Sequence, residues 1–247
     1  MNGDLLLRER YDRLADRLRA ACQAAGRDPG EVRVLAVSKT VSAARVLEMA
    51  ALGQRAFAEN YLQEAQAKIA ACALERPDLA LEWHFIGPIQ SNKTRPIAEH
   101  FAWVHSIERE KIARRLSDQR PAGASPLEAC IQVNASGEAS KSGCAPQQAL
   151  GLARAVAALP GLRLRGVMAI PEPASGYAAQ RAQCAAVRAV YERLRDAGLG
   201  VDTLSMGMSD DLEAAVAEGA TIIRVGTALF GPRPGAPNAP PALRPST

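Results

Sequence analysis

From Val32 to Thr40 the sequence reads VRVLAVSKT. The apolar residues of this stretch follow one another almost without interruption, a pattern typical of a strand that is buried on both faces of its sheet. Parallel sheets covered by helices require such strands. The stretch ends on the polar triplet Ser38-Lys39-Thr40. It therefore predicts a buried parallel strand that carries a lysine at its carboxyl end.

Seven further apolar segments are similar to this one. Together with the first, the predicted strands span 32–39, 56–60, 83–87, 103–107, 129–134, 164–170, 203–208 and 222–230. Helical patterns separate them at 43–52, 61–74, 91–99, 109–119, 146–158, 178–197 and 210–218. Eight strand–helix units in 247 residues predict an α/β protein, a single (β/α)8 TIM-type barrel, with an open doubly wound sheet as the alternative.

The two ends of the chain differ from this repeat. Apolar residues recur at intervals of three and four near the start and predict an extra N-terminal helix that ends near Gly26; they are Leu7, Tyr11, Leu14, Leu18 and Ala21. The last stretch is rich in proline, which continues neither helix nor strand. We therefore expect one barrel domain at 1–231 and a tail at 232–247, to which we assign no function.

Composition narrows the classes of partner. The net charge is +4 and the arginines are interleaved with acidic residues, so no nucleic acid is expected. No apolar run is long enough for a membrane span or a signal peptide, so we expect a cytoplasmic protein without a membrane partner. The five cysteines form no CxxC pair, and Asp210-Asp211 fits a helix start, so neither disulfides nor a metal are predicted.

Lys39 is one of only five lysines in the chain. In a barrel of this type the active face carries the carboxyl ends of the strands, where Lys39 would lie. A lysine in a partly dry pocket can lose its proton and attack a carbonyl, whereas an arginine cannot. Lys39 is therefore a candidate for a Schiff base, and a solvated cation at a strand end is the alternative.

The last two strand ends are suited to an anion. Ser209-Asp210-Asp211 is predicted to begin a helix, with Ser209 or Asp210 as its N-cap and free backbone N–H groups beside it. Gly226-Thr227 offers a close backbone and a hydroxyl. Loops after the seventh and eighth strands are the usual phosphate site of such barrels. A plain helix cap and a plain turn are the alternative interpretations.

Arg224 shares a strand face with Gly226, which lies two residues further along. An inward guanidinium would need either a carboxylate partner or a ligand such as an aromatic ring nitrogen. A lysine for an aldehyde, a phosphate turn and a donor for a ring nitrogen together indicate pyridoxal 5′-phosphate. Other lysine chemistry, such as that of an aldolase Schiff base, accounts for fewer of these residues.

Several motifs in order also resemble one known family, the pyridoxal phosphate homeostasis proteins, over roughly residues 5–232. They are Leu35-Ala36-Val37-Ser38-Lys39-Thr40, Glu59-Asn60-Tyr61, Trp83 to Lys93 (WHFIGPIQSNK), Ser140-Lys141-Ser142-Gly143, Arg165 to Pro171 (RGVMAIP), Ser205 to Asp211 (SMGMSDD) and Arg224 to Gly231 (RVGTALFG). The resemblance implies the barrel of the alanine racemase N-terminal domain and a covalently bound pyridoxal phosphate.

By this resemblance the cofactor-binding residues are identified one by one. Lys39 would form the Schiff base, and Arg224 would face the pyridine nitrogen. The phosphate would lie on Ser209, Gly226 and Thr227. Asn60 and Met206 would line the cofactor.

The implied role is to bind and buffer pyridoxal phosphate, and to hand it to PLP-dependent apo-enzymes as recipients, within vitamin B6 homeostasis. No catalytic residue is predicted, because two-base racemisation needs a proton carrier opposite the lysine. The candidates for that carrier, better explained by packing, are Tyr61, Tyr177, His84 and His105. A small amino-acid racemase and a PLP-sensing regulatory protein remain alternatives. Lys141 is a candidate for a second amine that receives or passes on the aldehyde. We expect the protein to be a monomer.

Overall fold

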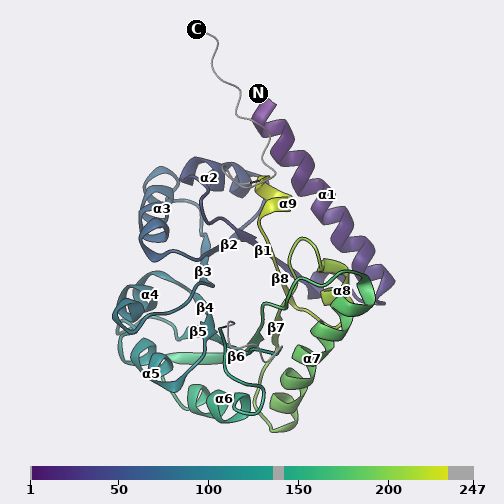
Figure 1. Cartoon of the computed structure of the whole chain (residues 1–247). Coiled ribbons are helices and arrows are strands. Elements are labelled where there is room, and N and C mark those ends of the chain that lie inside the picture. Colours follow the sequence, from purple (N-terminus) through teal and green to yellow (C-terminus); the bar gives the residue numbers. More distant parts are fainter. Residues whose placement is uncertain (1, 136–141, 233–247) are drawn as a thin grey trace.

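The computed structural model describes residues 2–135 and 142–232, in which eight strands close into one barrel (Figure 1). The strands are β1 (Arg33–Val37), β2 (Ala56–Glu59), β3 (Glu82–Phe85), β4 (Trp103–Ile107), β5 (Leu127–Gln132), β6 (Leu162–Met168), β7 (Thr203–Ser205) and β8 (Ile222–Val225). Each strand is parallel to the next, and β8 pairs with β1, for example Leu35 with Arg224. The predicted TIM-type barrel is confirmed, and the open sheet is not found.

Helices surround the barrel on the outside (Figure 1). They are α1 (Asn2–Ala24), α2 (Ala43–Ala51), α3 (Leu62–Glu75), α4 (Thr94–His100), α5 (Glu110–Asp118), α6 (Ala149–Ala157), α7 (Tyr177–Asp196), α8 (Leu212–Ala217) and α9 (Thr227–Phe230), with 3-10 turns at Pro29–Glu31 and Ser91–Lys93. Their buried residues face the strands, as in Val46, Met49 and Ala50 of α2. A sheet covered on its outer side explains why its strands read as continuous apolar runs.

The predicted last strand is too long. β8 ends at Val225, and Thr227–Phe230 form the short helix α9 after a turn at Gly226. Both parts are apolar, and an apolar run of this length does not distinguish a buried strand from a buried helical turn. This correction matters, because it places a helix start directly behind Arg224.

The predicted N-terminal helix is confirmed as α1. Leu7, Leu14, Leu18 and Ala21 are buried, while Tyr11 is half-buried. The helix lies along the outside of the barrel beside α8 and α9 (Figure 1). It therefore covers the part of the barrel in which the last strand meets the first.

The interior of the barrel is divided between small apolar clusters and polar side chains. One cluster contains Leu35, Ala56, Ala58 and Ile222, and another contains Trp103, Cys130 and Met168. The buried polar side chains that alternate with them include His84, His105, Ser205 and Arg224. No helix among the described residues is long and apolar enough to cross a membrane. Residues 233–247 of the predicted tail, 232–247, lie outside the described residues.

Candidate functional site

A cavity of about 500 Å³ opens at the carboxyl ends of the strands. Six of the seven residues predicted to bind the cofactor line it: Lys39, Asn60, Ser209, Arg224, Gly226 and Thr227. The other lining residues are Arg17, Val37, Ile86, Ile170, Met208, Asp210 and Ala228. Side chains from the two ends of the chain and from its middle therefore meet at one place, as the barrel topology predicts.

Met206 is the exception among the predicted residues. It follows Ser205, whose side chain points into the barrel, so strand alternation turns Met206 the other way. Its side chain is fully buried in the main hydrophobic core and does not line the cavity. Met208 lines the cavity in its place. A contact of Met206 with the cofactor stays a prediction.

The backbone in front of Lys39 is fixed by a buried ion pair. Lys68 of α3 donates to the carbonyl oxygen of Ser38 at 2.6 Å and to Glu59 Oε1 at 2.6 Å. The hydroxyl of Ser38 donates to the same Glu59 oxygen at 2.6 Å. Lys68, Glu59 and Ser38 are all buried between the barrel wall and α3. The backbone from which the Lys39 side chain extends therefore has little freedom to move.

The backbone behind Lys39 is fixed as well. Thr40 has a φ of 65°, a left-handed conformation that is strained for a β-branched residue. Its backbone N–H donates to Glu64 Oε1 at 2.6 Å, and Lys68 donates to that same oxygen at 2.9 Å. One cation and two carboxylates therefore hold both neighbours of Lys39.

Glu59 is not fully satisfied by this arrangement. Its side chain is completely buried, and Oε2 has no hydrogen-bond partner among the described residues. Burial raises the pKa of Glu59, and the hydrogen bonds from Lys68 and Ser38 oppose that shift. The charge on Lys68 is thus what keeps a buried carboxylate next to the Lys39 segment.

The turn after β7 differs in detail from the prediction. The N-cap of α8 is Asp211 and not Ser209 or Asp210, and Asp211 Oδ1 accepts the backbone N–H of Met208 at 2.6 Å. This bond curls residues 208–211 into a tight turn at the cavity. Arg17 of α1 donates to the Ser209 carbonyl oxygen at 2.6 Å and forms two bonds of 2.6 Å with Glu213. The turn is thereby anchored from outside the barrel.

The turn after β8 approaches the first strand closely. Gly226 is the N-cap of α9, so the backbone N–H groups at the start of that helix lie beside the cavity. A Cβ atom at residue 226 would lie 3.3 Å from the carbonyl oxygen of Val37. Glycine therefore keeps this corner open, which suits a phosphate group that is bound by backbone N–H groups.

Arg224 is buried, with 4% of its surface exposed. Its guanidinium donates to the carbonyl oxygens of Ser205 and Ala169, both at 2.7 Å, and to the Ser205 hydroxyl at 2.9 Å. No carboxylate contacts it among the described residues, so the ion-pair explanation considered for the sequence is wrong within that part of the chain. Burial lowers the pKa of Arg224 to about 10, so it remains charged at pH 7.

The residues considered as a second proton carrier lie elsewhere. Tyr61 and Tyr177 are more than half exposed, and neither lines the described cavity wall. His84 and His105 are completely buried inside the barrel and do not line it either. Lys141 lies outside the described residues.

Arg17 and Lys68, which hold the backbone of this site in place, were not expected from the sequence. Arg17 lies on an amphipathic helix, where nothing marks a partner almost two hundred positions away. Lys68 carries a weak signal, because it is a lysine on the same side of α3 as the buried Ala65 and Cys72. Helical spacing alone could have placed it against the barrel.

Comparison with known proteins agrees with this geometry. A family model described as the N-terminal domain of alanine racemase matches residues 10–234. The chain is 65% identical over 225 residues to the pyridoxal phosphate homeostasis protein of Pseudomonas aeruginosa, which covers 91% of this chain and 95% of that protein. The corresponding protein of Escherichia coli K12 is 51% identical over 218 residues, covering 88% of this chain and 93% of that protein.

A solved structure of PipY from Synechococcus elongatus, described as having PLP bound, is 38% identical to this chain. Its TM-score is 0.75, and the match covers 88% of this chain and 99% of that one.

Proposed function

The chain belongs to the pyridoxal phosphate homeostasis protein family, and on that premise we propose that it carries pyridoxal 5′-phosphate as a Schiff base on Lys39. Its cellular role would then be to bind, buffer and hand over this cofactor in vitamin B6 homeostasis. PLP-dependent apo-enzymes are the proposed recipients. The observation that carries the proposal is Arg224, a buried cation that no carboxylate of the described residues contacts, on the wall of the same cavity as Lys39.

The residues present fit the cofactor in three independent ways. Three of the five N–H groups of the Arg224 guanidinium make the contacts described, which leaves donors for an acceptor in the cavity. Asn60 Oδ1 is buried at the cavity without a hydrogen-bond partner among the described residues. Gly226 leaves a corner that a Cβ atom would fill. A buried oxygen without a hydrogen-bond partner, such as Asn60 Oδ1, is costly in a protein without a ligand.

Each side chain has a defined task in this proposal. Lys39 would hold the cofactor covalently, its amine nitrogen taking the place of the aldehyde oxygen, which would leave as water. Arg224 would donate a hydrogen bond to the pyridine nitrogen, and Ser209, Gly226 and Thr227 would hold the phosphate. When bound, pyridoxal phosphate supplies a reactive aldehyde and an electron-withdrawing ring. Because the guanidinium stays protonated, it disfavours protonation of the ring nitrogen and weakens that electron withdrawal.

A carrier is favoured over an enzyme by what surrounds Lys39. The fixed backbone on both sides of the lysine and the weak electron sink at Arg224 both suit storage of the cofactor. None of Tyr61, Tyr177, His84 and His105 lines the described part of the cavity, so none of them lies opposite the lysine there. These features support a protein that holds the aldehyde instead of using it.

The proposal is tested by reducing the loaded protein with borohydride and mapping the label by mass spectrometry. We expect the label on Lys39 and a visible absorbance band that Lys39→Ala abolishes. Lys93→Ala is the matched control and should keep both. A label on another residue, or none, contradicts the proposal. Incubation of the loaded protein with L-amino acids should give no D-enantiomer, and turnover that depends on Lys39 would favour a racemase.

A further inference from the structure

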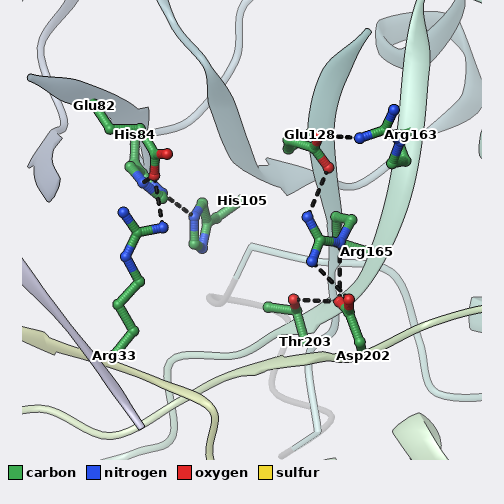
Figure 2. A network of polar contacts seen from close by, with 9 residues as sticks. All are labelled: Arg33, Glu82, His84, His105, Glu128, Arg163, Arg165, Asp202 and Thr203. Carbon is green, nitrogen blue, oxygen red and sulfur yellow. Dashed lines mark hydrogen bonds and ion pairs between the residues drawn. The ribbon is translucent and has the colours of Figure 1, made fainter. Parts of the chain in front are cut away.

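A line of hydrogen bonds runs through the inside of the barrel, from Arg224 to the opposite mouth. Arg224 donates to the Ser205 hydroxyl at 2.9 Å, and that oxygen lies 3.0 Å from His105 Nδ1. His105 Nε2 lies 2.9 Å from His84 Nδ1, and His84 Nε2 lies 2.5 Å from Glu82 Oε1 (Figure 2). The line thus joins four strands, β8, β7, β4 and β3, and ends at the first residue of β3.

For two neutral imidazole rings, the ends of this line set the direction of every bond in it. A guanidinium only donates, so the Ser205 hydroxyl accepts from Arg224 and is left with its own hydrogen to give to His105 Nδ1, which accepts in this arrangement. His105 then carries its proton on Nε2 and donates to His84 Nδ1. His84 in turn donates from Nε2 to Glu82, whose carboxylate only accepts. With both rings neutral, this single arrangement of protons satisfies every contact.

The environment of the line agrees with that arrangement. Ser205, His105 and His84 are completely buried, and burial lowers the pKa of both histidines. Neutral rings with one proton each are what the direction requires. Glu82 is one-third exposed and pairs with Arg33 at 2.7 Å. After burial, His84, Arg224 and Arg33 also lower the pKa of His105.

We propose that Ser205, His105, His84 and Glu82 are positioning residues for Arg224. The line fixes the guanidinium at the cavity wall and couples it to a carboxylate at the amino-terminal mouth of the barrel. Coupling of this kind is reciprocal, so a ligand on Arg224 changes the histidine rings, and a change at Glu82 changes ligand affinity. The inference rests on the proposed function only in taking the ligand of Arg224 to be pyridoxal phosphate.

A second polar network at the same mouth provides matched controls. Arg165 bonds to Glu128 at 2.9 Å and to Asp202 at 2.6 Å, and the Thr203 hydroxyl donates to Asp202 at 2.8 Å (Figure 2). Among the described residues this network shares no hydrogen bond with the line, although Arg165 lies over the ring of Trp103, which stacks on His84. Thr203 lies two residues before Ser205 on β7. Glu128, like Glu82, is a glutamate at the amino-terminal mouth of the barrel.

The first experiment needs no cofactor. The chain contains three histidines, and the third, His100, is exposed on α4, so the nitrogen NMR spectrum of the 15N-histidine-labelled protein is simple. We expect His84 and His105 to be neutral at pH 7, with the proton on Nε2. Glu82→Gln should change the ring protons of His84 and His105, because an amide can also donate, and Glu128→Gln should not. A proton on Nδ1 of His105 in the unaltered protein overturns the proposal.

The second experiment measures binding of pyridoxal phosphate by absorbance and repeats the NMR spectrum in its presence. Ser205→Ala should weaken binding about fivefold, the equivalent of one hydrogen bond. Thr203→Val removes the neighbouring hydroxyl and should leave affinity unchanged. In the unaltered protein the cofactor should shift both buried histidines but not His100, and Ser205→Ala should abolish the shift at His84. Equal losses in the two hydroxyl variants, or none in either, overturn the proposal.

The two experiments separate this inference from the proposed function. If the unaltered protein takes up no pyridoxal phosphate, the proposed function fails while the ring protons still decide whether the line exists. If Ser205→Ala does not fold, Glu82→Gln supplies the same test from the exposed end.

Discussion

Arg224 and Lys68 are both buried cations close to strand β1, but their surroundings differ. Lys68 contacts two carboxylates, Glu59 and Glu64, and one carbonyl oxygen. Arg224 contacts three oxygens, none of which carries a charge. Lys68 lies outside the barrel wall under α3, whereas Arg224 lies inside the barrel at the cavity.

The difference shows how the surroundings of a buried cation determine its role. A buried charge that is matched by a carboxylate holds its surroundings together, and removal of either partner leaves the other unpaired. A buried charge that is matched only by dipoles still has electrostatic attraction to offer a ligand. On this basis we assign Lys68 to the geometry of Lys39 and Arg224 to binding.

The largest expected effect comes from breaking the matched pair. Lys68→Met leaves Glu59 buried without its cation, and we expect a loss of about 3–5 kcal/mol in the free energy of unfolding, measured by urea denaturation. Lys111→Met, at an exposed position of α5, is the control and should change it by less than about 0.5 kcal/mol. Adding Glu59→Gln to Lys68→Met should recover part of the loss. Equal stability of the two lysine variants would remove the distinction between the cations.

Replacing the unmatched cation should have the opposite profile. Arg224→Gln keeps a donor but removes the charge, so we expect pyridoxal phosphate to bind about tenfold more weakly, as for one charge-assisted hydrogen bond. The free energy of unfolding should change by less than about 1 kcal/mol, because the buried charge is lost together with its contacts. Titration by absorbance and urea denaturation measure the two quantities. Full affinity with a large loss of stability would reverse our assignment.

Arg17 combines the two properties that the comparison separates, because it has a carboxylate partner and also lines the cavity. Arg17→Met should weaken binding of pyridoxal phosphate about threefold by releasing the turn at Ser209, with a loss of stability below about 1 kcal/mol. Arg27→Met is the matched control, since Arg27 binds the other end of α8 through the carbonyl oxygens of Val216 and Ala220. It should leave affinity unchanged. If Arg27→Met weakens binding equally, support of α8 as a whole is what matters.

The smallest effect concerns the far end of the polar line. Burial raises the pKa of Glu82, but the hydrogen bond from His84 and the charge of Arg33 lower it more, so it lies below its ordinary value of 4.5. The stability that Glu82 contributes is therefore complete above that value and is lost as the pH falls below it. Glu82→Gln should cost about 1 kcal/mol at pH 7, and the difference should shrink between pH 5 and 3. A difference that does not vary with pH would show that Glu82 acts only by packing.

Much of this fold was predictable because its strands carry a strong signal. Each strand is covered by helices, so its apolar residues are continuous, and the polar residues that follow mark one face of the barrel. The same rule predicts that Lys39, Asn60 and Arg224 lie at one end of the barrel, where they line a single cavity. The end of β8 was missed, because the apolar pattern continues through Gly226 into α9.

Contacts between elements that are distant in the sequence were not predictable. The pairing of Lys68 with Glu59 depends on how α3 lies on the wall, and the contact of Arg17 with Ser209 spans most of the chain. Spacing along a strand predicts His84 and His105 only as packing residues, because it does not show which rings meet across a barrel. A single sequence indicates on which face of a strand or helix a residue lies. It does not indicate which residue of another element contacts it.

The position of α1 beside α8 and α9 also determines the order in which the molecule can be completed. Among the described elements, α1 comes first in the chain and rests on two of the last, α8 and α9, and β1 can pair with β8 only after the chain has been made as far as residue 225. Until then the apolar side of α1, with Leu14 and Leu18, has no surface to cover. Newly made chains are thus exposed to chaperones and to aggregation until the final strand arrives, and the barrel closes late.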